Sequence, residues 1–152
     1  MREEGVSEMM RILVATDGSP HAIGAAKFSA RLVRELREAE VVLVNVGHIP
    51  AVALGGLGEG YINLSALEEG MKQAGEAILD ETAKAFAGID ARVSRVYRMG
   101  DPAGEIVKAA RECNADLIIM GSRGFGQIGG LILGSVSERV LHAAHGPVLI
   151  VR

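Results

Sequence analysis

Short apolar runs alternate with helical patterns along this chain, and that alternation constrains its fold more than any other feature. Four runs are rich in branched aliphatic residues and nearly free of charge, at residues 11–16, 41–46, 117–120 and 147–151. Runs without polar alternation are typical of strands that are buried on both faces of a parallel sheet. We therefore expect a strand at each of these positions, with helices that cross over the sheet between them.

A fifth strand and four helices complete the alternation. Apolar and basic residues mix at residues 92–98, which favours a strand at the edge of the sheet rather than at its centre. Serine and aspartate are good N-caps, and a serine followed three residues later by glutamate forms a capping box. These signals predict helices after Ser19 and after Asp101, a helix that starts with the box Ser65–Glu68, and a helix from Ser135 to His145.

The length of the chain predicts its domain organisation, and the second helical pattern along the chain predicts a buried face. The chain is long enough for one domain, which we place at residues 11–152, with residues 1–10 as a polar, flexible tail. The glycine-rich residues 47–64 predict a mobile loop, either a lid or a partner surface. The helix that starts at Ser65 is expected to face the core through Leu67, Met71, Ala74, Ile78 and Phe86.

Composition excludes several classes of function. The net charge is −3, the basic residues are scattered and only 3% of the residues are aromatic, so we expect no nucleic-acid partner. A single cysteine indicates a reducing compartment. The N-terminus has no signal-peptide core, and no apolar run approaches the roughly 20 residues of a membrane span. We therefore expect a cytoplasmic protein without a membrane partner.

The segment from Gly121 to Gly134 is the strongest functional signal. It follows a predicted strand and leads into the helix that starts at Ser135. A glycine loop before a helix N-terminus offers backbone N–H groups and the positive end of the helix dipole to an anion, above all a phosphate. A loop of this length is more often functional than not, although the glycines could also serve flexibility alone.

Two common phosphate motifs do not fit this segment. Residues 124–129 match Gly-x-Gly-x-x-Gly, but a dinucleotide fingerprint should turn straight into a helix, and here the helix starts only near Ser135. No glycine is followed by lysine and then serine or threonine in the frame of a Walker loop. A third spacing does fit: Gly121, Gly124, Gly134 and Ser135, with two and nine residues between the glycines.

This spacing resembles the Gly-x2-Gly-x9-Gly-Ser/Thr motif of the ATP-binding branch of the universal stress proteins. The resemblance covers nearly the whole chain. Ile12 to Ser19 is similar to the family's first strand and acidic turn, and residues 42–46 to its second strand, although histidine often stands where Asn45 is. Residues 100–103 and 146–151 match as well.

The resemblance implies a Rossmann-like fold, similar to that of the adenine nucleotide alpha hydrolases. Its parallel sheet would have the order 3-2-1-4-5, and ligands of such sheets bind at the carboxyl ends of the strands where the order reverses. It also implies a stress-response role and ATP, with Mg²⁺, as the ligand. By analogy, the base and ribose would lie at Ala15, Thr16, Asp17 and Val46, the same cleft would be lined by Met120, Gly121, Arg123 and Gly124, and the phosphates would meet N–H and hydroxyl donors of Gly134, Ser135, Val136 and Ser137.

Several residue roles stay open at this point. Asp17 could bind a ribose, hold Mg²⁺ or cap a turn, and Arg123 could reach a phosphate or lie in solvent. His142 and His145 have a spacing compatible with zinc, but histidines are common near helix C-termini, and we assign these two to that role.

Binding ATP does not imply an enzyme. Phosphoryl transfer needs a cationic clamp, a metal and a group that orients the nucleophile, and the glycine loop has no lysine. We therefore expect slow hydrolysis at most. The alternatives are an adenylating or ATP-cleaving enzyme of the related nucleotide-binding α/β proteins, and an interaction protein that binds no nucleotide.

A homodimer is the expected assembly. In the implied order, the last strand, Pro147 to Val151, lies at the edge of the sheet without a charged residue. Proteins rarely leave such an edge unprotected. Pairing with the same strand of a second copy would cover it, as is usual in the resembling family.

Overall fold

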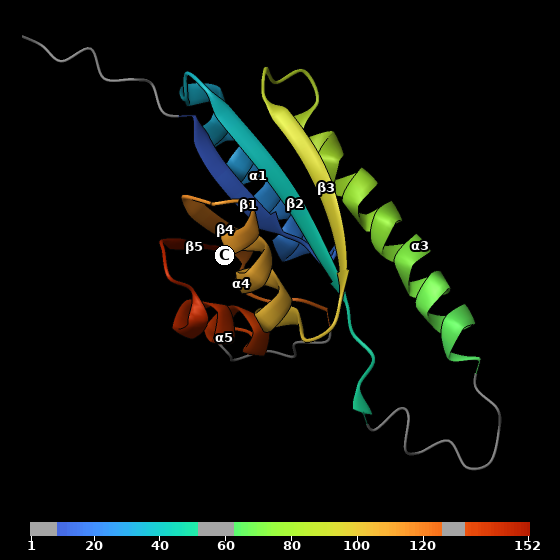
Figure 1. Ribbon diagram of the computed structural model, residues 1–152. Coiled ribbons are helices and arrows are strands. Elements are labelled where there is room, and N and C mark those ends of the chain that lie inside the picture. The colour runs from blue at the N-terminus through green and yellow to red at the C-terminus, as the bar shows by residue number, and fades with distance from the viewer. Residues whose placement is uncertain (1–8, 52–62, 126–132) are drawn as a thin grey trace, which may run out of the picture.

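A five-stranded parallel sheet forms the centre of the computed structural model, which describes residues 9–51, 63–125 and 133–152 (Figure 1). The strand order is β3-β2-β1-β4-β5, as the family resemblance implied, and both predicted edge strands lie at the edges. The strands are β1 (Met10–Ala15), β2 (Ala39–Gly47), β3 (Arg92–Met99), β4 (Leu117–Gly121) and β5 (Val148–Val151).

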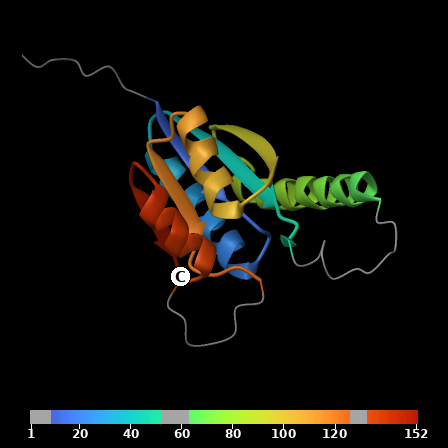
Figure 2. The same ribbon diagram turned by 60° about the horizontal axis from the view of Figure 1, so that its bottom comes forward.

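Helices cover both faces of the sheet, and they divide its core into two layers (Figures 1 and 2). The first layer contains residues of α1 (Pro20–Glu35), α3 (Leu64–Ala83) and the short 3-10 helix η1 (Lys84–Phe86). The second contains residues of α4 (Pro102–Glu112) and α5 (Ser135–Ala143). None of the helices in the described parts of the chain combines the length and hydropathy that a membrane crossing needs.

Successive residues of the central strands enter opposite layers. Ile12 and Val14 of β1 pack in the first layer, and Leu13 and Ala15 pack in the second. Because neighbouring side chains of a strand point to opposite faces, a strand covered on both sides must be apolar at every position. This is the physical origin of the continuous apolar runs.

Several predicted boundaries need corrections. Met10 belongs to β1, so it is not part of an N-terminal tail, while residues 1–8 and most of the predicted 47–64 loop lie outside the described residues. The N-cap of α3 is Asn63, whose Oδ1 accepts a hydrogen bond from the Ala66 N–H at 3.1 Å, so the Ser65 capping box is wrong. The helix α5 starts at Ser135 as predicted, with Gly134 as its N-cap, but it ends at Ala143 rather than at His145.

The predicted inner face of α3 is also wrong in part. Gly75, Leu79 and Thr82 are the buried residues of this helix, whereas Leu67 and Ala74 are exposed. A Cβ atom on Gly75 would collide with the Tyr97 ring and lie 2.6 Å from the Asn45 Oδ1. The helix therefore approaches the sheet through its smallest residue, which a search for large apolar side chains does not find.

Candidate functional site

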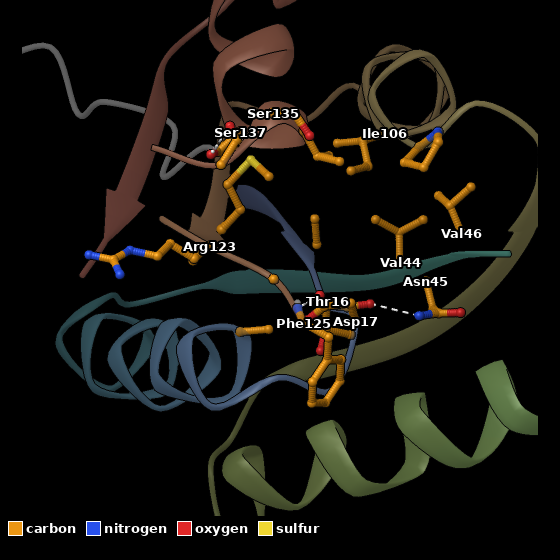
Figure 3. A pocket seen from close by; sticks show the side chains of 18 residues that line it. Thr16, Asp17, Val44, Asn45, Val46, Ile106, Arg123, Phe125, Ser135 and Ser137 are labelled. Carbon is orange, nitrogen blue, oxygen red and sulfur yellow. Dashed lines mark hydrogen bonds between the residues drawn. The ribbon is translucent and has the colours of Figure 1, made fainter. Parts of the chain in front are cut away.

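A cavity of about 280 Å³ lies at the carboxyl ends of β1 and β4, where the strand order reverses (Figure 3). Parallel α/β sheets bind their ligands at this position. All twelve residues that we predicted for a nucleotide site line it: Ala15, Thr16, Asp17, Val46, Met120, Gly121, Arg123, Gly124, Gly134, Ser135, Val136 and Ser137. The residues of the lining that sequence reasoning missed are Ala22, Val44, Asn45, Pro102, Ile106 and Phe125.

Some of the missed residues had a signal in the sequence. Val44 lies two positions before Val46 on one strand, so the two side chains must share a face. Figure 3 shows both valines pointing into the cavity, with Ile106 of α4 across from them. Ile106 and Ala22 come from helices, and only the tertiary structure brings them to the cavity.

The N-terminus of α5 presents open backbone donors to the cavity. The N–H of Gly134 donates to the Ser122 carbonyl at 2.7 Å, and the first bond within the helix runs from Glu138 N–H to the Gly134 carbonyl at 3.0 Å. Among the described residues, nothing accepts a hydrogen bond from the N–H groups of the first turn, at residues 135–137. The helices α1, α3 and α4 each have a side chain that caps this position. The first turn of α5 is therefore free to bind an anion.

The two serines of this turn have different roles. Ser137 is 2% exposed, and its hydroxyl donates to the carbonyls of Ser122 at 3.0 Å and Gly134 at 2.8 Å. It therefore holds the loop rather than offering a hydroxyl donor to a phosphate, as we had expected. Ser135 is exposed, and its hydroxyl makes no hydrogen bond within the described residues.

Asp17 connects the loops that follow β1 and β4. Its carboxylate accepts a hydrogen bond from Ser19 N–H at 2.9 Å and one from Phe125 N–H at 3.2 Å. A Cβ atom on Gly124 would collide with the Asp17 Oδ2, so a glycine is required for this approach. Asp17 thus has the turn-capping role, and each of its oxygens keeps a further lone pair for a ligand.

Thr16 joins the cavity wall to β2 and α3. Its carbonyl accepts a hydrogen bond from the Asn45 side-chain amide at 2.8 Å (Figure 3), and its hydroxyl lies 3.0 Å from the Thr82 hydroxyl. Because Thr82 donates its proton to the Ile78 carbonyl, Thr16 is the donor between the two threonines. The adjacent contact between this loop and α3 is apolar, because a Cβ atom on Gly18 would lie 3.2 Å from the Ile78 side chain.

Arg123 is one of the residues that line the cavity. Figure 3 shows its side chain leading away from the other labelled side chains. Its Nε atom is buried, and in the described part of the chain it has no hydrogen-bond partner. The geometry thus does not favour the phosphate contact that we had considered for this guanidinium.

An ion pair holds the two helices on this side of the cavity together. The Arg139 guanidinium of α5 donates to both oxygens of Asp101, the N-cap of α4, at 2.8 and 2.7 Å. The hydrogen bond from Arg139, together with that from the Gly104 N–H, holds the pKa of the Asp101 carboxyl below its ordinary value. This bond fixes the position of Pro102, which lines the cavity.

The Asp101 ion pair predicts a pH dependence of stability. A carboxyl whose pKa is lower in the folded chain stabilises the fold above its unfolded pKa of about 3.9, and this stabilisation is lost as the pH falls through the folded value. We expect Asp101→Asn, which keeps a capping side chain, to lower the urea midpoint at pH 7. The difference should shrink as the pH falls below about 5, because the Asp101 carboxyl is then progressively protonated and becomes neutral like the asparagine side chain. A difference that is independent of pH would mean that the charge contributes nothing.

The histidines near the end of α5, His142 and His145, belong to no cluster of metal-binding side chains in the described residues. His145 lies beside Arg111, whose Nη2 atom is 2.8 Å from the His145 Nε2. Across residues 9–51, 63–125 and 133–152, no group of three or more metal-binding side chains comes together. The zinc interpretation of His142 and His145 is therefore not supported.

Known proteins resemble this chain along almost its full length. Residues 9–152 match the model of the universal stress protein family. Universal stress protein MJ0531 of Methanocaldococcus jannaschii is 34% identical over 93% of this chain and 81% of its own length. Among solved structures, protein MJ0577 of the same organism has a TM-score of 0.80 and 29% identity, with coverage of 93% of this chain and 94% of its own. A universal stress protein solved in complex with cAMP has a TM-score of 0.68 and 25% identity, with coverage of 94% and 97%.

Proposed function

The chain belongs to the universal stress protein family, and we propose that it is a cytoplasmic stress-response protein that binds ATP with Mg²⁺ and acts as a homodimer. The observation that carries this proposal is the uncapped first turn of α5, which faces a cavity at the switch point of the sheet. Three backbone N–H groups and the Ser135 hydroxyl could bind phosphate oxygens there. A solved relative that binds cAMP supports an adenine nucleotide as the ligand class.

The apolar part of the cavity suits a base. Val44, Val46 and Met120 line it together with Ile106, and a purine ring would remove this surface from water. Asp17 stands between this part and the glycine loop, where a carboxylate can accept hydrogen bonds from ribose hydroxyls. Mg²⁺ usually keeps several waters and binds through the phosphates of its nucleotide, so this proposal requires no cluster of protein carboxylates.

We propose slow hydrolysis at most. The segment 121–134 has no lysine, and the Arg123 side chain leads away from the cavity. The phosphates would therefore meet backbone donors but no cationic clamp, and such a clamp is what accelerates phosphoryl transfer. A steady-state turnover by the pure protein of about one per second, an ordinary enzymatic rate, would contradict this.

Calorimetry of the ligand-free protein tests nucleotide binding. The protein is stripped of bound ligand by unfolding and refolding, and then titrated with Mg-ATP, ADP, AMP and cAMP. We expect micromolar binding or tighter for Mg-ATP, and weaker binding of AMP because it has fewer oxygens for the α5 turn. Equal affinities for all four nucleotides would mean that the first turn of α5 does not bind their phosphates. The absence of heat with every nucleotide would favour an interaction protein instead.

The two serines of α5 provide a matched pair of variants. We expect Ser135→Ala to weaken Mg-ATP binding by about 3- to 10-fold, the effect of one hydrogen bond of about 1 kcal/mol, without changing stability. Ser137→Ala should instead lower the urea midpoint, because it removes the buried hydrogen bonds from this hydroxyl to the Ser122 and Gly134 carbonyls. Equal effects of the two substitutions on binding would mean that both hydroxyls, or neither, contact the ligand.

The proposed dimer pairs the edge strand β5 of two copies. Leu149 and its neighbours in β5 are half-buried and uncharged, and the strand pairs only with β4 in the described chain. We expect Leu149→Lys to give monomers by light scattering, because a lysine would be forced into the new strand pair. Leu141→Lys, on the exposed surface of α5, is the control and should leave the assembly unchanged. A dimer that survives Leu149→Lys has its interface elsewhere.

A further inference from the structure

The ladder of hydrogen bonds between β1 and β2 stops before β2 ends. The two strands pair in register as far as Ala15 opposite Val44, and the last bond of the ladder runs from the Thr16 N–H to the Val44 carbonyl at 2.9 Å. In a parallel ladder the next bond would run from the Val46 N–H to the Thr16 carbonyl. Within the described residues this bond is not made, although β2 continues to Gly47.

A side chain replaces the missing donor. The Asn45 side-chain amide donates to the Thr16 carbonyl at 2.8 Å (Figure 3), and Asn45 is 6% exposed. Neighbouring residues of a strand point to opposite faces of the sheet. Val44 and Val46 pack in the layer of α4 and α5, so the Asn45 side chain lies on the face of α3, where its Oδ1 approaches Gly75. The Thr16 carbonyl is therefore turned towards α3.

This replacement leaves two backbone donors at the cavity. The C=O and N–H groups of a trans peptide point in opposite directions, so a Thr16 carbonyl turned towards α3 directs the Asp17 N–H to the other face, where the cavity lies. The N–H groups of Asp17 and Val46 have no acceptor among the described residues, and both residues line the cavity. Figure 3 shows both of them well apart from Ser135 of α5.

From this arrangement we infer that Asn45 is a positioning residue for the ligand. By holding the Thr16 carbonyl, it keeps the Val46 N–H from closing the ladder. By the same bond, it keeps the Asp17 N–H directed into the cavity. Without the amide, the buried carbonyl would lack a donor, and a rotation of the peptide towards Val46 would satisfy it and remove both donors from the cavity. The inference rests on the proposed nucleotide site and names the residue that prepares its base and ribose end.

Amide hydrogen exchange of the ligand-free protein, followed by NMR, tests this arrangement without a nucleotide. We expect the Val46 amide to exchange at least about 100-fold faster than the Val44 amide, which lies within the ladder to β1. In Asn45→Ala the ratio of the two rates should fall towards one, because Val46 gains the Thr16 carbonyl as its acceptor. A ratio near one in the native chain, or a high ratio that persists in the variant, overturns the inference.

Calorimetry separates the role of Asn45 from that of α5. We expect Asn45→Ala to weaken the binding of Mg-ATP, ADP and AMP by the same factor, about 3- to 10-fold, because the lost donors lie away from the phosphates. Asn45→His keeps a ring N–H that can donate to the Thr16 carbonyl, so it should lose less affinity than Asn45→Ala.

Ser29→Ala is the matched control. It removes another buried hydrogen bond from a side chain to a backbone carbonyl, the 2.8 Å bond from Ser29 to Ala25 within α1, and should lower the urea midpoint without changing affinity. Native affinity in Asn45→Ala, or an equal loss in Ser29→Ala, overturns the inference. A native chain that binds no nucleotide contradicts the proposed function instead, while the exchange ratio still tests the role of Asn45 independently.

Discussion

A Gly134→Asp variant is expected to lose Mg-ATP binding by about 100-fold or more while folding as stably as the native chain, or more stably. Gly134 is the N-cap of α5, and the first turn of this helix has no side-chain cap. An aspartate at an N-cap accepts hydrogen bonds from the same N–H groups that would bind phosphate, and relative to glycine it stabilises the helix by roughly a few tenths of a kcal/mol. Lost charge-assisted hydrogen bonds of about 1.5–3 kcal/mol and repulsion between the carboxylate and the phosphates together reach this factor.

Calorimetric titration and urea unfolding of the same preparations measure both halves of this expectation. Gly134→Asn is the matched variant, because it caps the same N–H groups without a charge and should lose less affinity than Gly134→Asp. Native affinity in the aspartate variant would mean that the phosphates bind away from α5. A lower urea midpoint would mean that the glycine is needed for space, not for open donors.

Leu79→Ala is expected to cost about 2–5 kcal/mol of unfolding free energy, the usual range for a buried leucine. Leu79 is 1% exposed and belongs to the core layer between the sheet and α3. Since a domain of this size has a total stability of about 5–15 kcal/mol, much of the margin would be lost. The measurement is urea unfolding at pH 7, with m-values compared to confirm that the transition is unchanged.

Leu67→Ala provides the control within the same helix. It has the same chemistry and the same change in helix propensity, but Leu67 is 40% exposed. We expect a change of less than about 0.5 kcal/mol, as for other surface substitutions. Equal losses at both positions would mean that the N-terminal half of α3 is packed in the isolated protein.

The strands could be predicted because local signals determine them, and twelve residues of the cavity lining because the glycine spacing resembles that of a known family. A central strand such as β2 must be apolar at every position, so its sequence reveals both its existence and its double coverage. The glycine spacing identifies the loop before α5, and the switch point of the sheet brings that loop to Thr16 and Asp17. Their positions follow from topology, and no knowledge of side-chain packing is needed.

The hydrogen bonds and the packing of α3 could not be predicted in this way. The helix turns Gly75 to the sheet because Tyr97 and Asn45, from two different strands, occupy the space that a side chain would need. Ser137 looks like a ligand donor in sequence, but its hydroxyl donates to the carbonyl of Ser122, fifteen positions earlier, and to that of Gly134. Both outcomes depend on residues that only the folded chain brings together.

The helix α3 touches the cavity wall with its C-terminal half, while its N-terminal half, from Leu64 to Gly70, is exposed. Its Thr82 bonds to Thr16, and its Ile78 packs against Gly18, both in the turn that follows β1. At 20 residues this helix is about 30 Å long. Thermodynamic linkage then makes the two ends of α3 reciprocal: if a nucleotide in the cavity changes the free energy of a contact made at the exposed end, that contact must change the affinity for the nucleotide by the same factor.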